Sequence, residues 1–239
     1  GDDFLKDSPV LSDLKLRVDW GQQGNQSGLG DYAWVQTYNT NYYDWTKDEY
    51  AEAVPTLGTK SNWKNESLTW ETTTQTNVGV DASLWGGRLG LVFDAYYKYT
   101  RGMLMSVAIP NQPNLTRNEG EMSNWGLEFA LNSVNVAKKD FEWSTDFNIS
   151  MNRNRLEKLA LRQVYYYVNP ESIGENIVRM EPGYPLSQFW GYTAKGVDPE
   201  TGLVIYEDLV PDGKINDSDK HYIGDANPDF IFGLTNNFR

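Results

Sequence analysis

Apolar and polar residues alternate along the segment 76–100, on both sides of a Gly-Gly pair. Every second residue is apolar from Val78 to Leu84 before the pair, and the same period continues from Leu89 to Tyr99 after it. A period of two predicts β-strands, and Gly86-Gly87 supplies the positive φ angles of a tight hairpin turn. The second strand would run for about 11 residues, longer than the roughly 5–6 residues of most soluble strands.

The same alternation recurs elsewhere in the chain. From Phe141 to Met151 every second residue is apolar except Thr145, and the opposite set, Glu142 to Asn152, is wholly polar. Further strands are predicted at 14–20, 125–131 and from 230 onward. Tight turns are expected at 86–87 and 137–140, and long loops at 21–67, 101–123 and 153–229, of which 153–167 could form a short helix. Since tight turns and long loops alternate, all short turns lie at one end of the predicted sheet.

Two arrangements explain this pattern. In an antiparallel β-sandwich the apolar face packs into a core, and in a membrane β-barrel it faces lipid while the polar face lines a wet lumen. Long strands, short turns at one end, long loops at the other and aromatic residues near strand ends are typical of the barrel. Trp85, Tyr97 and Tyr99 are then expected at the borders of the lipid-facing side, and the Gly86-Gly87 turn at the periplasmic end.

The polar face of such a barrel would carry charged residues into the hydrated lumen. We expect this of Asp81, Asp94, Lys98, Glu128, Glu142 and Asp146. The sequence predicts only about six or seven strands, and a closed membrane barrel needs at least about eight. We therefore expect the chain to be part of a larger barrel, which agrees with its lack of a signal-peptide pattern at the start and its end within a strand.

Composition removes several classes of function. The chain has 239 residues, no cysteine, a formal net charge of -12 and 14% aromatic residues. Without cysteine there is no disulfide scaffold or thiolate metal site, and an acidic chain lacks the basic face that nucleic acid requires. No apolar run approaches the roughly 20 residues of a membrane-spanning helix.

Two longer segments follow a known sequence pattern. "LKLRVDWGQQGNQSGLGDY" (14–32) is similar to "LKLRxSYGxxGNQxIGxY", and "LTWETTTQTNVGVDASLWGGRLGLVFDAYYKYTRGML" (68–104) is similar to "LxWExTxxxNxGxDxxxxxxRLxxxxDxYxKxTxxLL". In these segments the chain resembles the SusC/RagA family of TonB-dependent outer-membrane transporters. The similarity continues to "DGKINDSDKHYIGDANPDFIFGLTNNF" and so covers nearly the whole chain, 1–239, as a partial barrel domain without its plug.

The resemblance implies an all-β fold, an antiparallel transmembrane segment of a plugged barrel of about 22 strands with long extracellular loops. It also implies import of oligosaccharides or peptides across the outer membrane of Bacteroidetes. The implied partners are a SusD-like surface lipoprotein and the TonB system, with outer-membrane lipid around the barrel.

A possible calcium site lies in "DLVPDGKINDSD" (208–219). Asp208, Asp212, Asn216 and Asp219 fall at ligand positions 1, 5, 9 and 12 of a twelve-residue calcium loop, and Gly213 permits its sharp bend. Val210 stands where an oxygen ligand belongs, and the flanking helices of an EF-hand are missing. The alternative is an Asp-Gly turn held by side chain to backbone hydrogen bonds. No cofactor is required by either interpretation.

Aromatic residues outside the clear strands are candidates for cargo contact. Sugars stack on such rings, but loops also use them for packing and for contact with a partner. The candidates are Trp34, Tyr38, Tyr42, Tyr43, Trp45, Tyr165, Tyr166 and Tyr167.

Catalysis has little support. His221 is the only histidine, and no nucleophile motif or phosphate-binding loop is present. Glu119 and Glu121 could suggest a glycosidase pair, but with 33 acidic residues such spacings arise freely, and we expect both in an exposed loop. We therefore interpret the chain as part of a transporter and not as an enzyme; the alternative is a soluble β-sandwich that binds glycans through aromatic loops.

Overall fold

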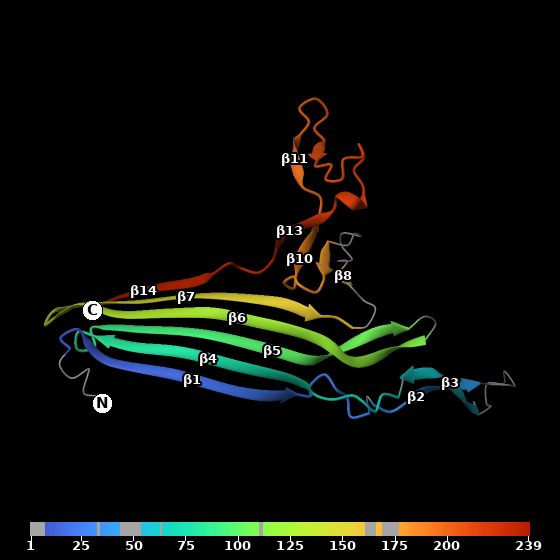
Figure 1. Cartoon of the computed structure of the whole chain (residues 1–239), viewed down its shortest axis with the longest axis horizontal. Coiled ribbons are helices and arrows are strands. Elements are labelled where there is room, and N and C mark those ends of the chain that lie inside the picture. Colours follow the sequence, from blue (N-terminus) through green and yellow to red (C-terminus); the bar gives the residue numbers. More distant parts are fainter. Residues whose placement is uncertain are drawn as a thin grey trace, which may run out of the picture.

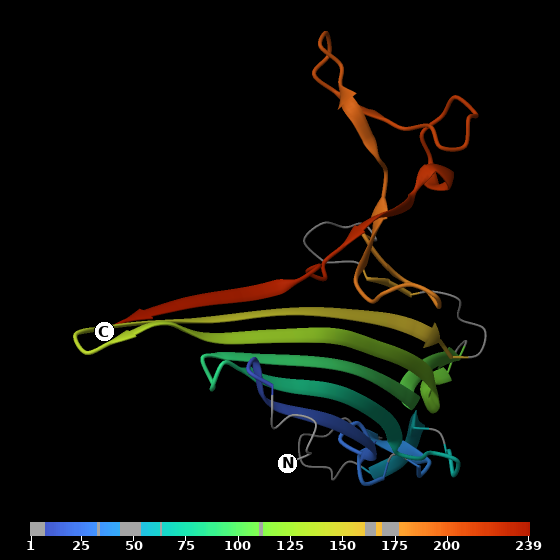
Figure 2. The same cartoon turned by 60° about the vertical axis from the view of Figure 1, so that its left-hand side comes forward.

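The computed structural model describes residues 8–32, 34–43, 54–62, 64–109, 112–160, 166–168 and 177–239. Its main body is one antiparallel sheet with the strand order β1-β4-β5-β6-β7-β14, curved like a section of a barrel wall (Figures 1 and 2). The strands are β1 (Leu11–Asn25), β4 (Glu71–Leu84), β5 (Leu89–Ile109), β6 (Gln112–Lys138), β7 (Phe141–Lys158) and β14 (Ile231–Phe238).

The described residues form three smaller sheets outside the main sheet; in Figure 1 one of them lies beyond the end away from the short turns, and the other two rise above the main sheet. The first is a hairpin of β2 (Thr37–Tyr43) and β3 (Val54–Asn62). The second contains β8 (Tyr166–Val168), β9 (Val178–Met180), β10 (Gln188–Gly191) and β13 (His221–Asp225). The third, β11 (Ala194–Val197) with β12 (Val204–Tyr206), forms an arm that rises away from the main sheet in both views (Figures 1 and 2), and one 3₁₀ turn, η2, spans Asp217–Asp219.

The tight turns form where the glycines and short polar linkers predicted them. Four residues join β4 to β5, and Trp85, Gly86 and Gly87 all have positive φ angles of 51°, 67° and 89°. Only Lys139 and Asp140 lie between β6 and β7. Both turns therefore lie at the same end of the sheet, as the alternation of short and long connections predicts.

Two predictions about the connections are wrong. The expected loop 101–123 is mostly strand. β5 continues through a bulge at Gly102, whose φ is 65°, and ends at Ile109, and β6 already begins at Gln112. The possible helix at 153–167 does not form in its described part, since β7 extends to Lys158. In both places, cross-strand hydrogen bonding continues through residues whose polarity alone suggested a loop.

The main sheet has almost no protein core. Among the described residues only Leu156, Leu159 and Ala160 are buried and apolar, and these lie at or beyond the end of β7. The apolar residues of the alternating pattern are instead widely exposed, with Leu16 at 68% and Phe232 at 63% of full exposure. A sandwich would cover this face with a second sheet, and no second sheet of the described residues covers it. The arrangement is therefore that of a barrel wall.

The sheet depends on close backbone approach at Gly126, on β6. A methyl group added there would lie 2.6 Å from the Met151 carbonyl oxygen and 2.6 Å from the Tyr96 hydroxyl. A backbone carbonyl cannot swing aside as a flexible side chain can.

We predict that Gly126→Ala lowers the free energy of unfolding of the full-length protein by about 1–3 kcal/mol, measured by urea titration in detergent or lipid.

Gly90→Ala is the matched control. Gly90 faces the same side of the neighbouring strand, but its added methyl group would meet nothing closer than Asn132 atoms at 3.9 Å. Its loss of stability should be small. Equal losses for the two variants would contradict the close-contact argument and point to a general glycine effect.

Candidate transport surface

One face of the main sheet is a continuous polar wall. Cross-strand register places Arg17, Gly79, Asp94 and Glu128 in one row across β1, β4, β5 and β6. Ser150 on β7 continues this row, and the next rows carry side chains of the same kind, including Asp19, Asn77, Tyr96, Asp81, Asn132, Asp146, Asn148 and Asn152. The predicted lumen-facing residues Asp81, Asp94, Glu128 and Asp146 all belong to this face.

An ion-pair cluster crosses three strands of this wall. The Arg17 guanidinium contacts Asp81 at 2.8 Å and Asp94 at 2.9 Å. Gly79 lies between Arg17 and Asp94 in the row, and a methyl group there would be 2.3 Å from Asp94 Oδ1 and 2.8 Å from the Arg17 Cζ. The missing side chain therefore lets Arg17 reach across β4. All three side chains keep about a third of their exposure, with values of 35%, 33% and 27%.

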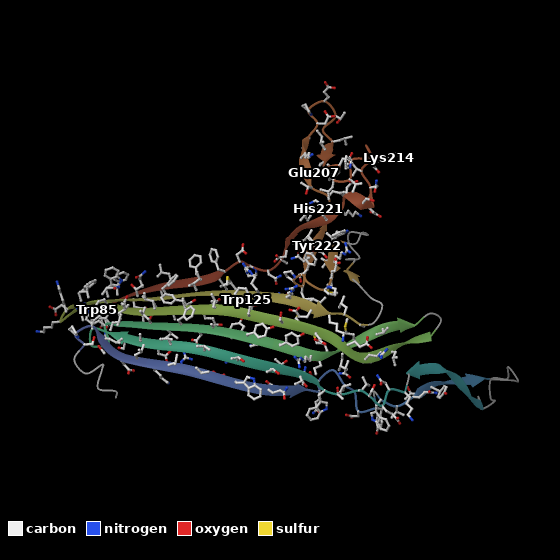
Figure 3. All side chains as sticks on the ribbon, in the orientation of Figure 1. Trp85, Trp125, Glu207, Lys214, His221 and Tyr222 are labelled. Carbon is white, nitrogen blue, oxygen red and sulfur yellow. The ribbon has the colours of Figure 1, made fainter. Side chains whose placement is uncertain are left out.

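The opposite face is bordered by two aromatic rows. Near the short turns, Trp143 and Phe141 stack on Phe238, with ring centroids 5.8 and 6.4 Å apart. Toward the other end, Trp20 and Tyr97 lie in one cross-strand row with Trp125, and that row ends at Arg153. Figure 3 shows Trp85 at the end with the short turns and Trp125 well away from it.

The distance between the rows matches a membrane. Trp143 and Arg153 are ten residues apart on β7. At about 3.3 Å per residue and a tilt of roughly 40°, this spans about 25 Å, the height of the apolar band of outer-membrane barrels. Because short turns mark the periplasmic side of such barrels, the Trp125 row marks the extracellular border.

The predicted aromatic candidates are only partly described. Trp34 and Tyr38 have exposed side chains, Tyr42 and Tyr43 lie in β2, and Tyr166 and Tyr167 lie in β8. Trp45 and Tyr165 lie outside the described residues. The described side chains of this set are therefore those of Trp34 and Tyr38 alone, and the role of the eight residues in cargo contact stays a prediction.

Trp34 lines a cavity of about 780 Å³ beyond the extracellular row. Trp70, which the sequence reasoning missed, lines the same cavity together with Gln26, Asp31 and Glu66. The ring of Trp70 packs on Gly24, whose added methyl group would be 2.9 Å from it. A tryptophan that directly precedes one strand can pack on a glycine of the paired strand. Pairing the residues of β1 and β4 in the sequence could therefore have predicted the position of Trp70.

The β8-β9-β10-β13 sheet is held by a cluster around Tyr222. Its ring stacks on Tyr184 at 4.2 Å between centroids and meets Trp190 edge-on at 5.0 Å, while the Arg179 guanidinium lies 4.1 Å from the Trp190 ring centroid. The Tyr222 hydroxyl donates to Glu181 at 2.7 Å. Partial burial, and then this bond to a carboxylate, raise the pKa of Tyr222. The neighbouring His221 begins β13 (Figure 3), and its ring contacts the Thr193 hydroxyl at 3.0 Å.

The 208–219 segment forms a tight loop centred on Asp219, which is 1% exposed. Asp219 accepts hydrogen bonds from the backbone amides of Leu209, Val210 and Asn216 at 2.8–3.0 Å. Asp208 accepts from the amide of Gly213, whose φ of 76° provides the predicted bend, and Asp212 accepts from Lys214. These are the bonds of the Asp-Gly turn interpretation.

The calcium interpretation stays a prediction. Asp208 Oδ1 is buried without a hydrogen-bond partner, as a cation ligand would be. In the part of the chain that the structure describes, however, no group of three or more His, Cys, Asp and Glu side chains is placed to hold a metal ion. Calcium titration calorimetry of the wild type and Asp208→Asn would decide between the two interpretations.

The possible glycosidase pair is not a pair. Glu119 and Glu121 lie within β6 and not in a loop, which corrects that expectation. Glu119 contacts Arg117 at 2.7 Å, whereas Glu121 accepts from the Tyr99 hydroxyl at 2.6 Å and lies 3.7 Å from the Lys158 ammonium. Each carboxylate thus contacts a different cation, and the Glu119 side chain is only 12% exposed.

No helix of the described residues is both long and apolar enough to cross a membrane. The family model for the TonB dependent receptor-like β-barrel matches residues 9–202. The chain belongs to this family. It is therefore part of an outer-membrane β-barrel of the SusC/RagA type, and the barrel fold predicted from the alternation and the resemblance is confirmed.

Individual relatives agree with this assignment. TonB-dependent receptor SusC of Bacteroides thetaiotaomicron is 35% identical over 251 residues, which cover 98% of this chain and 24% of SusC. TonB-dependent receptor P3 of Formosa agariphila is 31% identical, with 100% of this chain and 25% of P3 covered. The structure of the RagAB peptide transporter matches with a TM-score of 0.80 and 25% identity, covering 99% of this chain and 26% of that one. The chain thus spans about a quarter of the length of these relatives, and all three are named receptors or transporters.

The Asp219 hydrogen bonds predict how the 208–219 loop responds to pH. Backbone bonds from Val210, then Asn216, lower the pKa of Asp219 from its ordinary 3.8, and these outweigh the effect of burial. A lowered folded-state pKa stabilises the fold above the ordinary pKa, and this contribution is lost as pH falls through the folded value. We predict that hydrogen-exchange protection of the Leu209, Val210 and Asn216 amides holds from neutral pH to about 4 and falls below it.

Asp219→Asn should lose the protection of the Asn216 amide already at neutral pH, because the amide nitrogen that replaces Oδ2 cannot accept its bond. Asp217→Asn is the control, since the Asp217 side chain is 90% exposed and contacts Lys220. Protection in Asp219→Asn equal to the wild type would show that the carboxylate does not organise the loop.

Proposed function

We propose that the full-length protein imports oligosaccharides or peptides through its barrel, with TonB supplying the energy and a SusD-like lipoprotein acting at the extracellular mouth. The observation that carries this proposal is the polar wall on one face of a sheet whose other face is apolar and bordered by aromatic rows. A wall of this kind faces water and passes hydrophilic cargo, and it does no covalent chemistry.

The wall suits an uncharged or mixed-charge cargo. Asparagine, serine and threonine side chains are spread over it, and the acidic groups Asp81 and Asp94 are neutralised in part by Arg17. At the height of the extracellular row, Asn124 and Asn154 just above it and Ser150 and Asn152 just below it line a small cavity of about 330 Å³. Amides and hydroxyls both donate and accept, so they can hydrogen-bond either sugar hydroxyls or peptide groups.

The relatives support the choice of partner and energy source. SusC and P3 are named TonB-dependent receptors, and the structural match is a two-component transporter named for peptides. This chain contributes a wall of the barrel. The TonB contact, plug and lipoprotein contact of the proposal belong to the full-length protein and its partner.

Uptake by whole cells tests the proposal. Fluorescent neutral hexasaccharides and decapeptides would be offered to the wild-type host, to a strain lacking the transporter gene and to a strain lacking the neighbouring lipoprotein gene. We expect one cargo class to enter the wild type. The loss of either gene, or the addition of a protonophore, should reduce the entry of that cargo at least about tenfold. Undiminished entry of both classes without the transporter would refute the proposal.

A further inference from the structure

The outward, apolar face of the sheet becomes cationic just beyond the extracellular aromatic row. On β7, Arg155 follows the row residue Arg153 by two positions and so faces the same side. A bulge then places Lys158 opposite Glu121, again on the outward side. On β5, Arg101 shares this side with Tyr97 and Tyr99, and its guanidinium lies 5.1 Å from the Tyr99 ring centroid.

The cations form the outermost layer of this region. The side chains of Arg155 and Lys158 are 60% and 57% exposed, whereas those of Glu121 and Glu157 are each 28% exposed. Glu157 lies 3.8 Å from Arg155 and Glu121 lies 3.7 Å from Lys158, and each acid also accepts a shorter hydrogen bond, from the Ser123 and Tyr99 hydroxyls respectively, at 2.6 Å. Three well-exposed cations against two acids of lower exposure leave the outermost layer positive, in a chain whose net charge is -12.

The height of these side chains coincides with the lipid headgroups. Each residue along a tilted strand climbs about 2.5 Å, so Arg155 and Arg101 lie about 5–10 Å beyond the aromatic row. Aromatic residues mark the border of the hydrocarbon, and long basic side chains near that border extend into the headgroup layer. Guanidinium groups bind phosphate in two-bonded geometry, and ammonium groups bind it as point charges.

We propose that Arg101, Arg155 and Lys158 form a binding site for the phosphate groups of an anionic lipid in the outer leaflet. Arg153 is a structural neighbour and not a member of the site, because its guanidinium is held by the carbonyl oxygens of Pro228 and Asp229 and by the Asp229 carboxylate. The site would fix the barrel at one height and rotation against the lipid, independently of which cargo it carries.

Lipid retention by the full-length transporter tests this site. The protein would be placed in phosphatidylcholine nanodiscs and titrated with bisphosphorylated lipid A, with the bound lipid counted by native mass spectrometry. We expect the combined Arg101→Gln, Arg155→Gln and Lys158→Gln variant to bind lipid A at least about tenfold more weakly than the wild type. Dephosphorylated lipid A should bind the wild type as weakly as it binds the variant.

The control removes the same number of charges at the other end of the sheet. Arg88, Lys138 and Lys139 are exposed beside the short turns, and their combined change to Gln should leave lipid A binding unchanged. If the test variant fails to fold, Arg155→Gln alone, with folding checked by heat-dependent gel mobility, should weaken binding about threefold. Equal lipid A binding by wild type and folded variants, or full displacement of lipid A by 10 mM inorganic phosphate (about the highest cellular level), would overturn the proposal.

Discussion

In lipid, a backbone amide of this sheet can bond only to a neighbouring strand, because the hydrocarbon offers no other partner. That constraint explains the length and continuity of the strands. β4, β5, β6 and β7 pair with almost unbroken register through the membrane band, and the register shifts between these strands lie outside the rows from Trp125 to the short turns or at their border. It also explains why glycine is placed where strands and side chains come closest, as at Gly79 and Gly126.

The two faces are built for different solvents. The polar face forms bonds along its own surface, such as the Arg17 contacts with Asp81 and Asp94, so its charged groups are partly satisfied before any cargo arrives. Within the described part of the chain no second layer covers the apolar face, and its side chains are exposed from Leu16 on β1 to Phe232 on β14. The aromatic rows and the cations beyond them mark the boundary between the hydrocarbon of the membrane and the headgroup and water layers.

The alternation of apolar residues was enough to predict the strands, their faces and the short turns, because period two is a direct product of strand geometry. It failed at 101–123 and 153–158, where the strands leave the membrane and both faces meet water, so the apolar signal ends before the hydrogen bonding does. Trp70 was missed for another reason: its position depends on Gly24, which is far from it in sequence. The turn interpretation of 208–219 rested on local side chain to backbone bonds, and these the structure reproduces.

A wall without a protein core has a consequence for how its sequence can change. In a packed interior each side chain must fit its neighbours, so volume is constrained at every position. Lipid chains are fluid and adapt to any apolar shape, so residues such as Leu16, Val18, Phe232 and Leu234 need only remain apolar. Side-chain size is therefore constrained mainly on the polar face, where Gly79 lies under Arg17 and Gly126 lies under Tyr96. Related barrels should diverge freely on their lipid side while keeping their glycines and polar neighbours, the reverse of what is usual for soluble domains.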